Sequence, residues 1–200
     1  MSYSLSLYAV DLARVREAVG SGDQKLRRMV GGRFKGDMAR DDDWFSYEIR
    51  NGAPTRYEAL RAVIDGGPFE EAHAFQYAYA YQMLCRFHGR PLDNGSFSPF
   101  RGRWLDAVDE GLASLGVKAV SVAEFGSGSP PPPLPRPDDL PGYGEWSAEQ
   151  CREGLAQWEA ATPEQRAALD PEVLRAAESC AGWLRQVAQR EDCGIAGFHF

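Results

Sequence analysis

The sequence predicts an α+β fold: a mostly helical single domain over residues 1–200, with a small sheet joining the N-terminal and C-terminal strands. Three observations predict it. Apolar residues recur at helical spacing behind several capping signals. Both ends of the chain have the pattern of strands. The short stretch after a proline-rich segment is too small for a second stable domain, and its last strand needs a partner elsewhere.

The first elements follow from alternation and capping. Residues 3–10 alternate large apolar side chains with serines, which predicts a strand. Asp11 is a suitable N-cap for a short helix over residues 12–19. After a break at Ser21-Gly22, a second helical segment carries Leu26, Met29 and Val30 on one face.

Two further helix signals lie between residues 41 and 66. Three consecutive aspartates, residues 41–43, precede Trp44, and we expect them at a helix start, where carboxylates complement the helix dipole. Thr55 and Glu58 have the spacing of a capping box for a helix over residues 55–64. A Gly-Gly-Pro sequence then closes that helix.

Residues 75–83 alternate large aromatic with small or polar side chains, Phe-Gln-Tyr-Ala-Tyr-Ala-Tyr-Gln-Met. This alternation fits a strand, but we favour a helix, because the segment from Glu70 to Cys85 is long for a strand and rich in helix formers. A helix with aromatic side chains on two sides is enclosed by protein. Its three tyrosine hydroxyls then need hydrogen-bond partners. The pattern leaves open whether this segment is core or lines a pocket.

The second half of the chain begins with a loop over residues 92–102, an amphipathic helix over residues 103–115 and a strand over residues 117–125. Residues 126–144 hold seven of the 13 prolines. We expect this segment to be an internal polyproline-type connector with no means of packing a core.

Capping signals also define the C-terminal part. Ser147 and Thr162 open helices over residues 148–160 and 163–169, and a third helix covers residues 171–190. The chain closes with a strand over residues 194–200. We expect this strand to pair with residues 3–10 or with residues 117–122.

The formal net charge of −7 is unevenly distributed, since residues 1–40 sum to +4 and residues 41–200 to −11. An acidic protein disfavours nucleic-acid binding, which needs a basic face. A local cluster of basic residues suits one anionic group or a solvated helix face. Its members are Lys25, Arg27, Arg28, Arg33 and Lys35.

The expected location is cytoplasmic. The four cysteines, at positions 85, 151, 180 and 193, are widely spaced, which favours buried thiols over disulfides. No apolar run approaches the roughly 20 residues of a membrane span. The N-terminus lacks the basic and long apolar regions of a signal peptide. We therefore expect no membrane partner.

Several stretches resemble an uncharacterised bacterial family of about this length, found in actinobacteria and relatives. They are Trp44-Phe45, residues 53–67, residues 75–81, residues 93–101 and Gly144-Glu145-Trp146. The likeness covers nearly the whole chain. A fainter likeness, to the YfbM-like family of unknown function, rests on the N-terminal strand and helix and on the final helix and strand. These resemblances imply a cytoplasmic bacterial α+β domain and supply no activity and no catalytic residue.

The most site-like segment is the loop over residues 93–102, which combines a carboxylate, an amide, two phenylalanines and Arg101. Arg101 is suited to bind a carboxylate or phosphate through two hydrogen bonds. Alternatively, the phenylalanines fill the core and Arg101 begins the next helix. With two tyrosines of the aromatic segment, the candidate ligand-binding set is Tyr77, Tyr81, Asp93, Asn94, Phe97, Phe100 and Arg101.

Other chemistry-bearing residues lack the required spacing. Cys85 and His88 share a helix face, but no motif lowers the thiol pKa or supplies an oxyanion site. Neither they nor His73 and His199 have the spacing of a zinc motif. A Pro-x-x-Pro sequence at residues 132–135 suits an aromatic groove or a stiff connector. We therefore name no catalytic residue and expect no metal and no cofactor.

Two functions from different classes remain. The first is a protein-binding domain of inhibitor or immunity type, whose acidic charge attracts a basic protein partner. The second is a small enzyme or ligand-binding domain whose pocket is lined by tyrosine and arginine. Convergence of Tyr77, Tyr81, Asp93, Asn94 and Arg101 in one cleft favours the second, and an acidic surface the first. A structural subunit, the third alternative, requires a large exposed apolar patch. Oligomeric state does not follow from the pattern.

Overall fold

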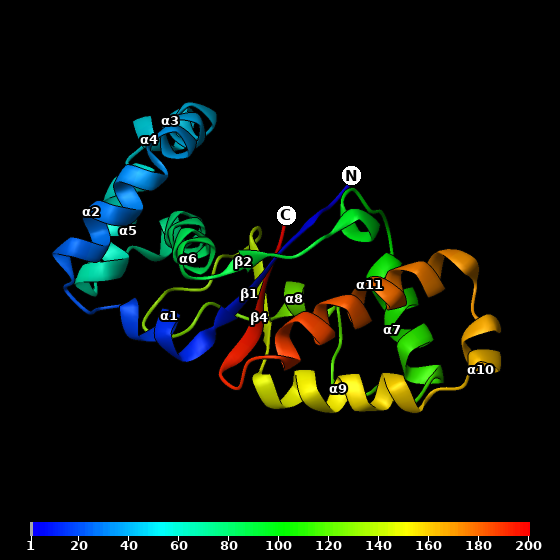
Figure 1. The fold of residues 1–200 in the computed structure, drawn as a ribbon. Helices are drawn as coiled ribbons and strands as arrows, with labels where there is room; N and C mark the ends of the chain where they lie inside the picture. Colours follow the sequence, from blue (N-terminus) through cyan, green and yellow to red (C-terminus); the bar gives the residue numbers. More distant parts are fainter. Residues whose placement is uncertain (1) are drawn as a thin grey trace. The chain divides into compact units, whose positions relative to one another are not determined.

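The structure, a computed structural model, describes residues 2–200 and has a mostly helical α+β fold, as predicted (Figure 1). Four antiparallel strands form one sheet in the order β2-β1-β4-β3. They are β1 (Leu5–Asp11), β2 (Arg90–Pro91), β3 (Gly142–Trp146) and β4 (Cys193–His199). The predicted pairing of the N-terminal and C-terminal strands is confirmed, since Leu5 faces His199 and Asp11 faces Cys193.

The chain divides into two compact units. The sheet unit comprises residues 2–12, 89–128 and 142–200, and the helical unit comprises residues 13–88 and 129–141. The single-domain organisation stays a prediction. The helices of the sheet unit are η2 (Gly95–Phe97), α7 (Trp104–Ser114), α8 (Glu124–Ser127), α9 (Ala148–Ala160), α10 (Pro163–Ala167) and α11 (Pro171–Ala188).

Local signals place the helices of the sheet unit. Capping boxes at Ser147 and Thr162 open α9 and α10, as predicted. Asp170 caps α11, and Pro171 fits its first turn because its missing N–H needs no partner there. Figure 1 shows α11 and α9 running side by side. Their apolar faces enter the core, where Trp146 and Trp183 are among the largest fully buried side chains.

The helical unit begins at Ala13 inside α1 (Leu12–Ala18). Its other helices are α2 (Gln24–Arg33), α3 (Lys35–Trp44), α4 (Ser46–Arg50), α5 (Arg56–Asp65), η1 (Glu71–His73) and α6 (Ala74–His88). The predicted capping box of Thr55 and Glu58 is present at the start of α5. Gly66 ends α5 with φ +86°, a left-handed conformation that favours glycine. The aromatic segment is a helix, α6, as we favoured.

The expected helix start at residues 41–43 is wrong, because these residues lie in the last turns of α3. Their carboxylates serve α5 instead. The Arg56 backbone N–H, in the first turn of α5, donates to Asp42 Oδ1 at 2.7 Å, and Arg56 Nε donates to Asp41 Oδ2 at 3.2 Å. The carboxylates therefore still complement a helix N-terminus, but one that tertiary structure brings to them.

The expected strand over residues 117–125 is also wrong. The Asp109 carboxylate accepts the backbone N–H groups of Val122 and Ala123, at 2.7 and 3.1 Å, and the Ser121 hydroxyl at 2.6 Å. These backbone donors are therefore not available to a sheet, and the chain turns into α8. The edge of β4 is taken by β3, a strand at the end of the proline-rich segment.

The proline-rich segment also packs, which corrects the expectation that it has no means of doing so. Pro130, Leu134, Pro137 and Pro141 are buried, whereas Pro132 and Pro133 are exposed. The segment thus alternates between packed and solvated residues. Its description as a connector between the elements on either side stays a prediction. None of the helices in residues 2–200 has the length and apolar character to cross a membrane, and the cytoplasmic location stays a prediction.

Candidate functional site

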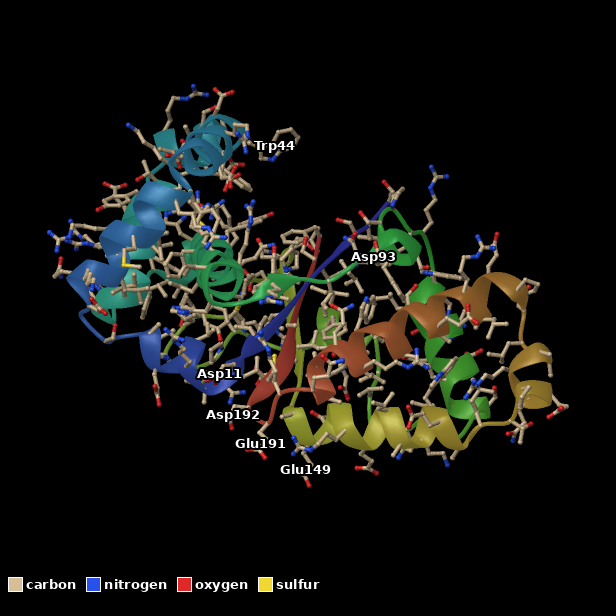
Figure 2. The ribbon with its side chains drawn as sticks, viewed as in Figure 1. Asp11, Trp44, Asp93, Glu149, Glu191 and Asp192 are labelled. Carbon is tan, nitrogen blue, oxygen red and sulfur yellow. The ribbon has the colours of Figure 1, made fainter. Side chains whose placement is uncertain are left out.

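The loop after β2 places Asp93 and Asn94 in structural roles at the backbone. The Asn94 side-chain amide donates to the Leu5 carbonyl, and the Trp183 indole N–H donates to the Asp93 carbonyl at 2.6 Å. The Asp93 carboxylate is exposed, and Figure 2 labels its place on this loop. Phe97 is fully buried, with its ring centroid 5.1 Å from that of Trp183. Three of the seven candidate residues therefore hold the loop against the sheet unit.

Phe100 and Arg101 line a cavity of about 280 Å³ in the sheet unit. Phe100 is fixed by its backbone, which exchanges two 2.8 Å hydrogen bonds with Tyr3. We call this cavity the arginine cavity. Its lining residues are Ser96, Pro99, Phe100, Arg101, Trp104, Glu172 and Arg175.

Tyr77 and Tyr81 are buried side chains of α6 in the helical unit. The Tyr77 hydroxyl accepts the Glu70 backbone N–H at 3.3 Å, and its ring centroid lies 5.0 Å from that of Phe69. The candidate set is thus distributed over both units, and its role in ligand binding stays a prediction.

A second cavity, of about 370 Å³, lies in the helical unit and combines aromatic walls with carboxylates. We call it the acidic aromatic cavity. Its aromatic residues are Trp44, Phe45, Phe75 and Tyr79; its acidic residues are Glu48, Glu71, Asp138 and Asp139. Trp44 is 82% exposed. Figure 2 shows its side chain projecting away from the end of α3.

The aromatic wall is supported from within by a buried cation. The Phe45 ring centroid lies 5.3 Å from that of Phe75 and 5.4 Å from that of Tyr79. The guanidinium of Arg56, which is fully buried, lies 4.4 Å from the Tyr79 ring centroid and donates to the Gln76 carbonyl at 3.1 Å. This stacking fixes the wall on the side of α5 and α6.

Two effects shift the pKa of Arg56 in opposite directions. Burial lowers the pKa of the Arg56 guanidinium below its ordinary value, and the nearby Asp41 carboxylate opposes this shift. Burial also raises the pKa of Tyr79, so the tyrosine wall is neutral at physiological pH. The Asp41 carboxylate, which forms an ion pair with Arg56, offsets the positive charge of the guanidinium. The acidic residues around the cavity are therefore not needed to balance it.

The carboxylates of the acidic aromatic cavity are available to a ligand. Across residues 2–200, Glu48, Glu71, Asp138 and Asp139 form no ion pair and accept no hydrogen bond through their carboxylates. Aromatic faces and carboxylates both attract cations, and the attraction strengthens where water is excluded. The arrangement is therefore suited to hold a guanidinium or ammonium group.

Sequence reasoning missed this cavity. In the sequence, Trp44 follows an expected helix start, Trp44 and Phe45 belong to the family resemblance, and residues 137–140 belong to the proline-rich segment; none of these patterns indicates a cavity. An available signal was Trp44 directly after three aspartates, an unusual position for a core tryptophan. The proximity of residues 137–140 to α4 and α6 has no local signature.

The basic cluster of α2 and α3 does not converge on one point. Arg28 and Lys35 line a cavity of about 470 Å³ beside Tyr57. Arg27 instead pairs with Asp65 at 3.4 Å, and Arg33 stacks on Phe34 and Phe87. Two of the five basic side chains, those of Arg27 and Arg33, are therefore engaged within the helical unit.

The cysteines are free and buried, as the spacing predicts. Burial raises the pKa of Cys151 to about 12, and it raises the pKa of Cys180 well above its ordinary value. Both thiols are therefore protonated and poorly nucleophilic. Within the part of the chain that the structure describes, no group of three or more His, Cys, Asp or Glu side chains is placed to hold a metal ion.

Comparison with known proteins gives a family without an assigned activity. A family model described as a domain of unknown function, DUF7691, matches residues 1–200. This confirms the predicted likeness to an uncharacterised family over nearly the whole chain. The fainter likeness to the YfbM-like family and the actinobacterial type stay predictions. No curated protein and no solved structure matches the chain.

Proposed function

Because the chain belongs to the DUF7691 family of unknown function, we propose its function on physical grounds: it is a protein-binding domain that holds a basic segment of a partner in the acidic aromatic cavity. The partner's cationic side chain lies against the aromatic wall, and the carboxylates surround its charge. An inhibitor or immunity-type role is the finer form of this proposal, since such domains act by binding one partner.

The exposed indole of Trp44 carries the proposal. Tryptophan presents a large apolar surface, and it is among the residues most enriched at the energetic centres of protein interfaces. Here it adjoins a cavity whose carboxylates have no basic partner in the described chain. A surface of this composition complements a basic segment better than a neutral or acidic one.

The two kinds of group have separate tasks. The carboxylates, together with the net charge of −7, attract a basic partner over distances comparable to the Debye length and raise its association rate. The aromatic side chains act at contact, where they shield the cation from water and slow dissociation. Added salt should therefore change the association rate constant more than the dissociation rate constant.

The test is titration of the full chain with a short arginine- and lysine-rich peptide, followed by calorimetry and tryptophan fluorescence. Trp44→Ala should weaken binding about 30-fold, which corresponds to the roughly 2 kcal/mol of an interface hot spot. The triple variant E71Q/D138N/D139N should lower the association rate and reduce its salt dependence.

Matched controls separate a site from general charge attraction. Tyr57→Ala removes another exposed aromatic residue of the helical unit, outside this cavity. The triple variant E149Q/E159Q/E178Q removes three exposed carboxylates of the sheet unit. Tyr57→Ala should bind the peptide as the wild type does, and E149Q/E159Q/E178Q should lower the association rate much less than E71Q/D138N/D139N does. Equal losses in the two triple variants, or unchanged binding by Trp44→Ala, would contradict the proposal.

A further inference from the structure

Independently of the proposed function, we infer that the arginine cavity of the sheet unit binds a small carboxylate that carries an aromatic or branched aliphatic group. Arg101 and Arg175 would hold the carboxylate, and Trp104 and Pro99 would contact the apolar group. The inference rests on unpaired guanidinium groups, on a fixed apolar wall and on the local charge.

Two arginines face this cavity without a protein partner. In residues 2–200, the guanidinium groups of Arg101 and Arg175 form no ion pair and donate no hydrogen bond. Neighbouring Arg103, which does not line the cavity, donates from Nε to Asp106 Oδ2 at 3.0 Å. Arginine presents its donors as a planar fork that matches carboxylate oxygens. Among the described residues the Glu172 carboxylate, which also lines the cavity, pairs with neither arginine, so an anionic ligand can supply their acceptors.

The apolar wall is fixed in place. The Trp104 indole N–H donates to the Ser96 carbonyl at 2.9 Å, which sets the orientation of its ring. Phe100 is held by its two backbone hydrogen bonds with Tyr3. A cavity of about 280 Å³ lies at the small end of ligand sites, so it suits a ligand about the size of one ring with a short acid.

The arginines stand on anchored elements. Arg175 lies in the second turn of α11, whose start is held by the Asp170 side chain through the backbone N–H groups of Glu172 and Val173. Arg101 directly follows Phe100, which is paired to Tyr3. Binding therefore orders the two arginine side chains and leaves the backbone as it is, which limits the entropic cost.

Glu172 selects the charge of the ligand. It lines the same cavity, so the two arginines and this glutamate sum to one positive charge. A singly charged carboxylate balances that charge, whereas a phosphate monoester carries up to two negative charges and is repelled by Glu172. A carboxylate is therefore the favoured anion.

The test uses phenylacetate as the probe and the full chain as the protein. Binding is measured by calorimetry and by the indole N–H resonance of Trp104, identified with Trp104→Phe. Three further probes have nearly the same ring and length: 2-phenylethanol lacks the charge, phenyl phosphate carries more of it, and phenethylamine reverses it. We expect phenylacetate to shift the Trp104 resonance and the three other probes to bind at least tenfold more weakly.

Arginine variants test which guanidinium groups bind the carboxylate. R101Q and R175Q should each weaken phenylacetate binding at least tenfold, and the double variant should show no saturable binding. R103Q is the matched control and should bind as the wild type does. All three arginines are exposed, and unchanged melting temperatures will show that the variants fold. Glu172→Gln should strengthen binding of phenyl phosphate more than that of phenylacetate.

Four results would overturn the inference. Equal binding of 2-phenylethanol would remove the role of the arginines. Tighter binding of phenyl phosphate would identify a phosphate site instead. A loss in R103Q equal to that in R101Q would reveal unspecific attraction. No shift of the Trp104 resonance at millimolar phenylacetate would exclude the cavity as the site. Each result is independent of the peptide titration, which tests the helical unit.

Discussion

The two units use tryptophan in opposite ways. In the sheet unit, the indole N–H groups of Trp104, Trp146 and Trp183 donate to backbone carbonyls, and the last two side chains are buried. In the helical unit, Trp44 is mostly in solvent. The difference extends beyond tryptophan. Among the described residues, the exposed large apolar side chains all belong to the helical unit: Met29, Trp44, Tyr47 and Tyr57.

This difference shows where each unit can interact. The sheet unit buries most of its large apolar side chains, and one of its small cavities is lined by two exposed arginines that have no protein partner among the described residues. The helical unit instead pairs a buried arginine, Arg56, with Asp41 and leaves aromatic surface outside. A small ligand suits the first arrangement, and a macromolecular partner suits the second.

Substituting one tryptophan from each unit tests this comparison most strongly. Trp183→Ala should lower the free energy of unfolding by about 3–5 kcal/mol, because it leaves a cavity and removes the donor to the Asp93 carbonyl. Trp44→Ala should change it by less than about 0.5 kcal/mol, since its side chain is already in water. Denaturant unfolding of both variants measures this. Similar losses would mean that Trp44 is a packing residue and would break the comparison.

The buried charge of the helical unit gives the next largest effect. Asp41→Asn should cost about 2 kcal/mol of stability, because it removes the charged acceptor of the fully buried Arg56 guanidinium. Asp43→Asn is the matched control, since Asp43 is exposed two positions further along α3, and it should change stability by less than about 0.5 kcal/mol. Thermal melting of the two variants at pH 7 distinguishes them; equal melting temperatures would contradict the role assigned to Asp41.

The thiols of the sheet unit should make stability fall in alkali. Burial holds the pKa of Cys151 at about 12, whereas an unfolded chain ionises its thiols near pH 9. Because the pKa is raised in the folded state, the unfolded state loses the proton first, and stability declines from about pH 9 towards pH 12. At pH 10 the expected loss from Cys151 is about 1 kcal/mol.

Comparison of the wild type with Cys151→Ala isolates this contribution. Other groups titrate in both proteins, so the measured quantity is the difference between their stability curves from pH 8 to pH 11. The alanine variant should have the shallower decline. Parallel curves would show that Cys151 is accessible to water in the folded protein.

The helix caps give the smallest effect and compare the units directly. The cap of α5 in the helical unit uses Glu58, whereas the caps of α9 and α10 in the sheet unit use Gln150 and Gln165. Hydrogen bonds from the Thr55 backbone and hydroxyl lower the pKa of Glu58. The contribution of the Glu58 charge to folding stability is therefore present above the ordinary glutamate pKa, and it is lost as the pH falls through the lowered pKa.

Glu58→Gln should lower the free energy of unfolding at pH 7 by less than about 1 kcal/mol, because an uncharged glutamine keeps the capping geometry. The variant should also lose the part of the acid dependence of stability that Glu58 contributes, because glutamine does not titrate. Gln150→Glu should introduce an acid dependence into the cap of α9. Unfolding at pH 7 and pH 3 checks both variants. An unchanged acid dependence in Glu58→Gln would show that the cap contributes nothing through its charge.

Structural features that depend on residues a few positions apart were predictable from the sequence. The capping boxes at Thr55, Ser147 and Thr162 lie where the sequence puts them, because each depends on two residues three positions apart. The aromatic segment over residues 75–83 was predictable as a helix by composition. The alternation alone predicts a strand, and only the surrounding helix formers favour a helix.

The candidate site was predictable in part. The loop composition predicts Arg101 as an anion-binding residue, and it lines a cavity. Nothing in the sequence of α11 distinguishes Arg175, which lines the same cavity, from its neighbours. Asp93, Asn94 and Phe97 anchor the loop through a backbone carbonyl, a side-chain amide and a ring contact, and their role in ligand binding stays a prediction. Residue type alone does not distinguish a side chain that binds a ligand from one that binds its own backbone.

By itself, the sequence determined the fold class and most helix positions, and it narrowed the partner of the last strand to residues 3–10 or residues 117–122. These depend on periodicity and caps, whose range is a few residues, and on the need of the last strand for a partner. Tertiary structure alone decided that β3 rather than residues 117–125 completes the sheet, that Asp41 serves Arg56, and that Trp44 is exposed. Each of these depends on which groups distant in sequence compete for one donor or one buried surface. That competition is resolved only when the chain is packed.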